Sequence, residues 1–308
     1  MINHRRLRDI LPVPIPTPFD ASRFVADLAA ARGRRIVVHP MTLPTTGALC
    51  GLSVAEGSTD HILVAADTPT LHHHHVLLHE LAHILLDHRS HLPTTAGLAL
   101  APELVERVLG RTPRDSYTDT QEREAEDLAT TIAVHAATHT GRTGRAGAML
   151  RWSTYNRLYR AMHPLWHALH EIQPGIALEP PTDPTVDTPL PTRGGLRALY
   201  RRVIEIQDGA RLAARYLDET VTADVDRLVS SAGLPTQQAT ATSLGGSLSI
   251  ALRLRREDPH RKPTARHSPT GMPTPDDDVL SCARVLALAS QAFHRWPLIG
   301  SPSAPAHA

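Results

Sequence analysis

The sequence predicts a protein in two parts, an α+β domain over residues 1–146 and a mostly α-helical domain over residues 147–308. Three observations support this expectation. The chain of 308 residues is about twice as long as a typical single domain. Strand-like and helix-like patterns alternate in the first part, whereas only helical patterns follow. A glycine-rich stretch, Gly141 to Gly147, separates them and marks the expected boundary.

The first part carries both helical and extended patterns. An amphipathic repeat over Ala21–Arg32 predicts a short helix. Thr68-Pro69 is a helix-start signal, and the nearly all-apolar run behind it predicts a buried helix over Thr70–Arg89. A second strong helix is expected over Asp119–His135, with a short one possible at Pro102–Leu109. Runs of Val, Ile and Leu bounded by turn residues predict three strands: Arg35–His39, Leu49–Val54 and His61–Ala66.

The second part consists of helical patterns separated by proline-rich connections at 174–191 and 259–275. Leu199, Val203 and Ile206 recur at helical spacing, which favours a packed bundle. The expected helices are Leu150–Ile172, Leu196–Leu217, Glu219–Ala232, Gln237–Arg256 and a last one that runs from the acidic residues at 276–278 to Phe293.

Charge and composition exclude several classes of protein. Lys and Arg number 32 against 31 Asp and Glu, so the basic excess typical of nucleic-acid-binding domains is missing. The N-terminus lacks the apolar segment of a signal peptide, and no apolar stretch is long enough to span a membrane. Cys50 and Cys282 cannot form a disulfide framework. We therefore expect a cytoplasmic protein that does not bind nucleic acid directly.

The strongest motif is His79-Glu80-Leu81-Ala82-His83, an H-E-x-x-H sequence within the apolar helix. Two histidines four residues apart share one helix face, so both imidazoles can bind one Zn²⁺, and Glu80 can act as general base. At this composition about 0.05 chance matches to the pattern are expected. We therefore predict one zinc ion per chain, with His79 and His83 as ligands.

A catalytic zinc normally has three protein ligands, and the helix over Asp119–His135 offers several carboxylates. Glu124 and Asp127 border the apolar face of this helix, whereas Glu122 and Glu126 are expected on the solvent side. Because the three glutamates lie about 200° apart in succession around the helix, only one can face the histidines squarely. The helical pattern favours Glu124 as the third ligand and leaves Asp127 open.

H-E-L-x-H followed by a helix with E-A-x-x-(apolar)-A resembles the ImmA/IrrE family of bacterial metallopeptidases over about residues 20–135. The resemblance implies a zincin-like α+β metallopeptidase domain whose substrate is a helix-turn-helix repressor. It also implies that His79, His83 and Glu124 hold the zinc and that Glu80 is the catalytic acid/base. On this assignment Glu124→Ala sharply weakens zinc binding and abolishes cleavage, while Glu122→Ala and Glu126→Ala leave both nearly unchanged.

Other histidines allow alternative interpretations. The run His72–His75 could form a second metal or substrate site, but we expect it to be the exposed first turns of the helix. His163, His167 and His170 could also hold a metal, although a basic surface is the favoured interpretation. His135 and His139 could approach the cleft. The segment around His163 resembles a helical domain of unknown function from high-GC Gram-positive bacteria, a resemblance that brings no catalytic function. Because this part shows no catalytic chemistry, we expect it to recognise a partner or to regulate the peptidase.

Two functions follow from these patterns. The first is a zinc endopeptidase that cleaves a regulatory protein, with strand His61–Ala66 as the sheet edge that aligns the substrate by main-chain pairing. The alternative is a regulatory or toxin–antitoxin-type interaction protein that uses the zinc fold for partner binding with little proteolysis.

Overall fold

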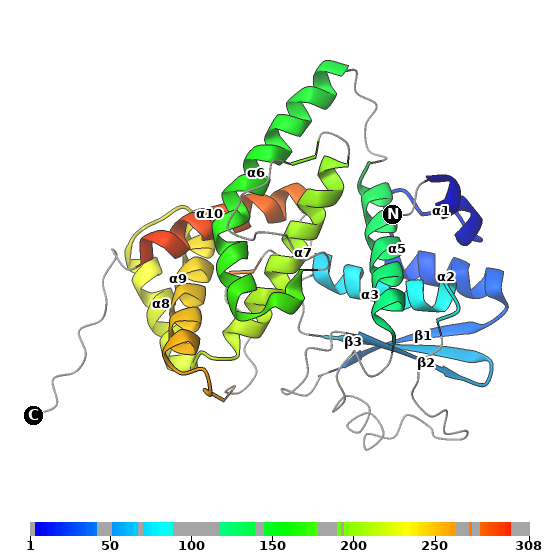
Figure 1. Ribbon diagram of the computed structural model, residues 1–308, viewed down its shortest axis with the longest axis horizontal. Coiled ribbons are helices and arrows are strands. Elements are labelled where there is room, and N and C mark those ends of the chain that lie inside the picture. The colour runs from blue at the N-terminus through cyan, green and yellow to red at the C-terminus, as the bar shows by residue number, and fades with distance from the viewer. Residues whose placement is uncertain are drawn as a thin grey trace, which may run out of the picture. The chain divides into compact units, whose positions relative to one another are not determined.

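The computed structural model describes residues 4–41, 51–66, 70–88, 117–138, 145–177, 190–191, 194–262, 271–272 and 278–296 (Figure 1). The chain forms two compact units, residues 1–149 and 150–308, compared with a predicted boundary between residues 146 and 147. The predicted helix at Pro102–Leu109, the helix-start pair Thr68-Pro69, Cys50 and His139 lie outside the described residues, as do most of both proline-rich connections.

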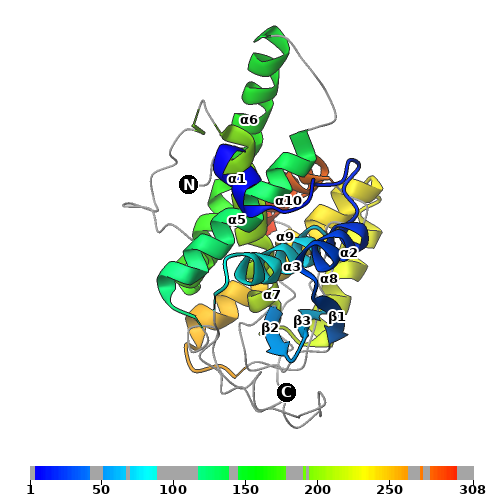
Figure 2. The same cartoon turned by 90° about the vertical axis from the view of Figure 1, so that its right-hand side faces the viewer.

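The first unit contains a three-stranded sheet in the order β1-β3-β2, formed by β1 (Arg35–Met41), β2 (Gly51–Glu56) and β3 (Thr59–Ala65). β1 pairs with β3 in parallel and β2 pairs with β3 antiparallel. Figure 2 shows β3 between the other two strands. The prediction that His61–Ala66 is an edge strand is therefore wrong: both sides of β3 are hydrogen-bonded, and β1 and β2 are its neighbours.

Helices cover one face of this sheet (Figure 1). They are α1 (His4–Ile10), α2 (Ala21–Arg32), α3 (Thr70–Leu85) and α5 (Asp119–Thr138). Alternate β3 residues, Ile62 and Val64, point into a core shared with Leu28 of α2, Leu81 of α3 and Leu128 of α5. α2 begins where Asp20 accepts a hydrogen bond from the Arg23 amide. The core fixes α3 between the sheet and α5, and the apolar run predicts a buried helix here.

The second unit is helical throughout its described residues. Its helices are α6 (Arg145–Ile172), α7 (Gly195–Ala214), α8 (Glu219–Ser231), α9 (Thr236–Glu257) and α10 (Val279–Arg295), with a short 3-10 turn at Pro174–Ile176. α6 begins at Arg145, so Gly147 lies within a helix rather than in the predicted glycine-rich break. Leu199, Val203 and Ile206 are buried, which confirms the predicted apolar face. Within the described residues, no helix combines the length and apolar character needed to cross a membrane.

Close packing of α9 against α10 leads to a stability prediction. A Cβ at Gly245 would clash with the carbonyl oxygen of Ala289, so the two helix backbones would have to separate. Gly245→Ala should therefore destabilise the second unit by about 1–3 kcal/mol, as overpacking typically does. At Gly175 a Cβ would meet its nearest atom at 3.7 Å, an ordinary contact. Thermal unfolding should show the loss for Gly245→Ala and not for Gly175→Ala; equal stability of the two variants would contradict this packing.

Candidate metal site

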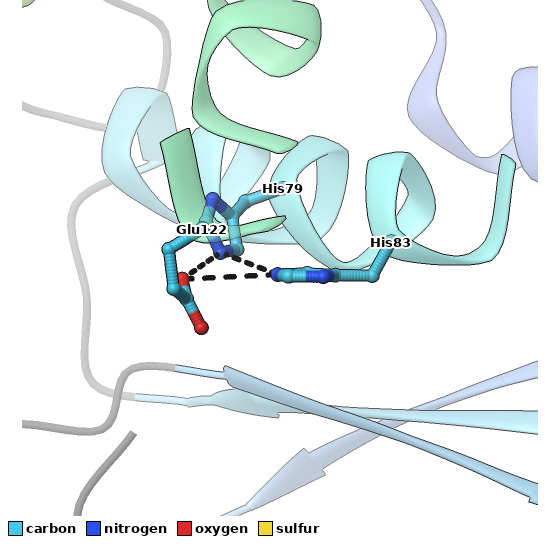
Figure 3. Close-up of side chains that lie close together, drawn as sticks. All are labelled: His79, His83 and Glu122. Carbon is cyan, nitrogen blue, oxygen red and sulfur yellow. Dashed lines mark hydrogen bonds and ion pairs between the residues drawn. The ribbon is translucent and has the colours of Figure 1, made fainter. Parts of the chain in front are cut away.

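Helix α3 presents the two histidines of the H-E-x-x-H motif on one face, toward α5 (Figure 3). The rest of α3 is embedded in the core, with Leu77, Leu78 and Leu81 buried. The Nε2 atoms of His79 and His83 lie 3.1 Å apart. The spacing of four residues thus brings the two imidazoles together, as the sequence predicts.

Glu122 of α5 completes a group of three possible ligands. Its Oε2 lies 3.2 Å from His79 Nε2 and 3.8 Å from His83 Nε2. In the described part of the chain, His79, His83 and Glu122 form the group of histidine, cysteine or acidic side chains that could hold a metal ion (Figure 3). The carboxylate comes from a helix that packs directly on α3.

The third member of this group is Glu122 and not Glu124, which corrects the sequence-based assignment. The buried face of α5 runs through Ala125, Ala129 and Ile132, and Glu122 stands three residues before Ala125, on the same side. Glu124 lies about 200° further round the helix. Its side chain is half exposed, and its Oε2 lies 3.4 Å from His88 Nε2 instead.

Glu126 also departs from the prediction that it faces solvent. Its Oε2 lies 3.0 Å from His79 Nδ1, on the side of the ring away from the cluster. Its Oε1 lies 2.8 Å from His75 Nε2 and accepts a hydrogen bond from the Thr130 hydroxyl. His72 and His75 are buried, so the expectation that this histidine run forms exposed helical turns is wrong for both. The reason is that α5 covers this side of α3.

The end of α3 brings a further histidine to the site. Asp87 has a φ of 53°, in the left-handed region, and the amide of His88 donates to the carbonyl of His83. This turn folds His88 back against the helix, where its Nδ1 lies 3.1 Å from His83 Nδ1. The sequence analysis missed His88, because a left-handed aspartate at a helix end leaves only a weak signal.

Glu80 lies against β2. It accepts hydrogen bonds from the side chain and backbone of Ser53, while its Oε2 has no hydrogen-bond partner within the described residues. Burial raises the pKa of Glu80 to about 7. A Cβ at Gly51 would lie 2.9 Å from Glu80 Oε1, so the absence of a side chain there makes room for this carboxylate.

Tyr117 is a second residue that the sequence analysis missed. Its ring stacks on His83, with centroids 3.8 Å apart, and its hydroxyl lies 3.1 Å from Ser53 Oγ. Burial raises the pKa of Tyr117, so it is a neutral phenol near pH 7. A signal existed in the sequence: Thr118 and Gln121 form a capping box that starts α5 and places Tyr117 directly before the helix.

The protonation states of the cluster suit a cation. Burial would raise the pKa of Glu122, but hydrogen bonds to His79 and His83 hold it at about 2. Burial lowers the pKa of His83 to about 4. Near neutral pH the site therefore offers an ionised carboxylate and a neutral imidazole, the forms in which these side chains bind metals.

The spacing of the three atoms fits tetrahedral zinc. Ligand atoms about 2.0–2.1 Å from a tetrahedral zinc lie about 3.3–3.4 Å from one another. The separations among His79 Nε2, His83 Nε2 and Glu122 Oε2 are 3.1, 3.2 and 3.8 Å. Two nitrogens and one carboxylate oxygen also leave a fourth position for water or substrate, which is typical of catalytic rather than structural zinc.

Histidines of the second unit belong to a different environment. His163 stacks on Trp166, and its Nδ1 lies 3.4 Å from Arg202, whose guanidinium packs on the rings of Trp166 and Tyr159. His170 also stacks on Trp166. Neither they nor His167 form a metal-binding group within the described residues. His135 lies in the last turn of α5 and outside the cluster.

Comparison with known proteins gives a match in the second unit. Residues 151–295, from α6 to the end of α10, match a family of unknown function, DUF6545. The description of this family assigns no activity, so the match adds no chemistry to the helical unit. No curated protein and no solved structure matches the chain.

Proposed function

We propose that the first unit is a zinc-dependent endopeptidase that cleaves a protein substrate. The convergence of His79 Nε2, His83 Nε2 and Glu122 Oε2 at tetrahedral spacing is the observation that carries this proposal. The burial of Glu80 directly after the first ligand supports it. The resemblance of H-E-L-x-H and its downstream helix to ImmA/IrrE metallopeptidases points to the same activity.

The residues divide the chemistry as follows. Bound zinc would polarise the scissile carbonyl and acidify a bound water. Glu80 Oε2, which has no hydrogen-bond partner within the described residues, accepts the proton of the attacking water and passes it to the leaving amine. Ser53 orients the Glu80 carboxylate. The neutral Tyr117 hydroxyl, held beside Ser53, is a donor near the reacting atoms.

Strand β2 is the element that would align an extended substrate. It pairs with β3 along one side, and among the described residues no strand pairs with its other side. Gly51 and Ser53 of β2 lie beside Glu80. A peptide that added to this edge by main-chain hydrogen bonds would therefore pass the general base. In this proposal β2 takes the role that the sequence analysis gave to His61–Ala66.

The family resemblance suggests a helix-turn-helix repressor in the cytoplasm as the substrate, and the helical unit would recognise a partner or regulate cleavage. The test uses purified protein and candidate helix-turn-helix repressors, beginning with any that is encoded beside its gene. Cleavage that is lost with a chelator and with Glu80→Gln supports the proposal. Tight binding without cleavage would instead support an interaction protein.

A glycine substitution should separate cleavage from metal binding. In Gly51→Ala the new methyl group would lie 2.6 Å from Val76 Cγ1 and 2.9 Å from Glu80 Oε1, so the carboxylate must shift. Because small displacements of a catalytic group are costly, cleavage should fall by about 10²-fold while zinc content is unchanged. Ala55→Ser, at an exposed position of the same strand, is the control. Full activity of Gly51→Ala would mean that β2 does not position Glu80.

A further inference from the structure

The side of each histidine ring that faces away from the cluster is occupied by a separate contact. His79 Nδ1 lies 3.0 Å from Glu126 Oε2, and His83 Nδ1 lies 3.1 Å from His88 Nδ1. The second contact continues outward, because His88 Nε2 lies 3.4 Å from Glu124 Oε2. Both paths therefore end on a carboxylate of α5.

These contacts fix where the ring protons lie. An ionised carboxylate only accepts hydrogen bonds, so His79 must carry its proton on Nδ1 to donate to Glu126. By the same reasoning His88 carries its proton on Nε2, toward Glu124, and its Nδ1 is an acceptor. His83 must then donate from its own Nδ1. If a metal replaced the contacts among His79 Nε2, His83 Nε2 and Glu122 Oε2, each ligand histidine would offer it the electron pair of Nε2.

We propose that Glu126, and Glu124 acting through His88, are positioning residues that hold His79 and His83 in the metal-binding tautomer. This inference rests on the proposed metal site and not on cleavage. The three alternate glutamates of α5 then have different roles. Glu122 is the ligand, Glu126 orients His79, and Glu124 orients His88, which in turn orients His83. Outer partners of this kind are general for metal-bound histidines.

Burial strengthens the contacts of His79 with Glu126 and of His83 with His88. The side chains of His83 and His88 are 1 % and 7 % exposed, so water competes little for their shared hydrogen bond. Glu126 is 12 % exposed and is held by His75 and Thr130 on its other oxygen. Glu124 is half exposed, which means that its removal leaves no cavity and should not disturb the fold.

Zinc affinity, measured by chelator competition, tests the roles of Glu126, His88 and Glu124 and needs no substrate. Glu126→Ala, His88→Ala and Glu124→Ala should each weaken zinc binding by about 10–100-fold, the usual effect of losing an outer partner. Because Glu124 acts only through His88, the double variant should bind no more weakly than His88→Ala alone. His88→Gln, whose amide can accept from His83 and donate to Glu124, should recover most of the loss.

Asp119→Ala is the matched control, since it removes the same charge from the exposed first turn of α5. ¹⁵N NMR of the metal-free protein supplies a second readout: His79 and His83 should both carry the Nδ1 proton, and His83 should lose this preference in His88→Ala. If the losses of Glu124→Ala and His88→Ala simply add, or if His83 carries its proton on Nε2, the proposal is overturned. A native protein that binds no zinc would instead refute the proposed function, and the NMR result would still decide the tautomers.

Discussion

Glu122→Ala should weaken zinc binding by more than about 100-fold, beyond the range expected for loss of an outer hydrogen bond. The carboxylate oxygen of Glu122 lies within 3.8 Å of both imidazole nitrogens and is the only acidic atom in this group. Its removal leaves two ligands, too few for a stable catalytic site. Glu124→Ala and Glu126→Ala should lose less, because the Glu126 carboxylate contacts the outer ring nitrogen of His79 and the Glu124 carboxylate contacts only His88.

Chelator competition, measured side by side on Glu122→Ala, Glu124→Ala and Glu126→Ala, ranks the three variants by zinc affinity. Asp127→Ala belongs in the same series, since the sequence left this residue open as a ligand. If Glu124→Ala or Asp127→Ala loses more zinc affinity than Glu122→Ala, the position of α5 against α3 in this structure is incorrect.

Replacement of the general base has the second large expected effect. Glu80→Gln keeps the size of the side chain but cannot take up a proton, so cleavage of the substrate should fall by about 10²–10⁴-fold. Zinc content should not change, because Glu80 lies against β2 and outside the ligand group. Glu56→Gln, a partly exposed position at the end of the same strand, is the control.

Cleavage rates and zinc content have to be measured on the same preparations. Glu80→Gln protein that holds zinc and has lost cleavage supports the assigned role. Undiminished cleavage by this variant would show that another group moves the proton.

The local features of the site could be predicted from the sequence. The apolar run around Val76 to Leu86 indicates a buried helix, and the spacing of His79 and His83 places both rings on one face. These inferences need only helical periodicity, which is a local property. The predicted strands overlap β1, β2 and β3, although their bounds differ by a few residues.

The choice among the α5 glutamates could not be made in the same way. Glu122 was expected on the solvent side although it stands three residues before the buried Ala125, and the fact that decides between Glu122 and Glu124 is how α5 is rotated about its axis against α3. That rotation depends on side-chain packing between distant segments, including Ala125 and Ala129 against the metal helix. Periodicity within α5 alone could not supply it.

Long-range contacts account for the remaining differences. His88 reaches His83 only because Asp87 adopts a left-handed conformation, and Tyr117 reaches it from the other end of a long connection. The order of the strands also depends on pairing that no short pattern encodes, so β3 was taken for an edge. The burial of His75 follows from the same packing of α5.

In the proposed site His79, His83 and Glu122 hold one zinc ion. Metal analysis of purified native protein, His79→Ala, His83→Ala and the second-unit control His163→Ala tests it most directly. We expect about one zinc per chain in the native protein and in His163→Ala, and close to none in the other two. Full zinc content in His83→Ala, or a native protein without bound zinc after loading, would contradict the account.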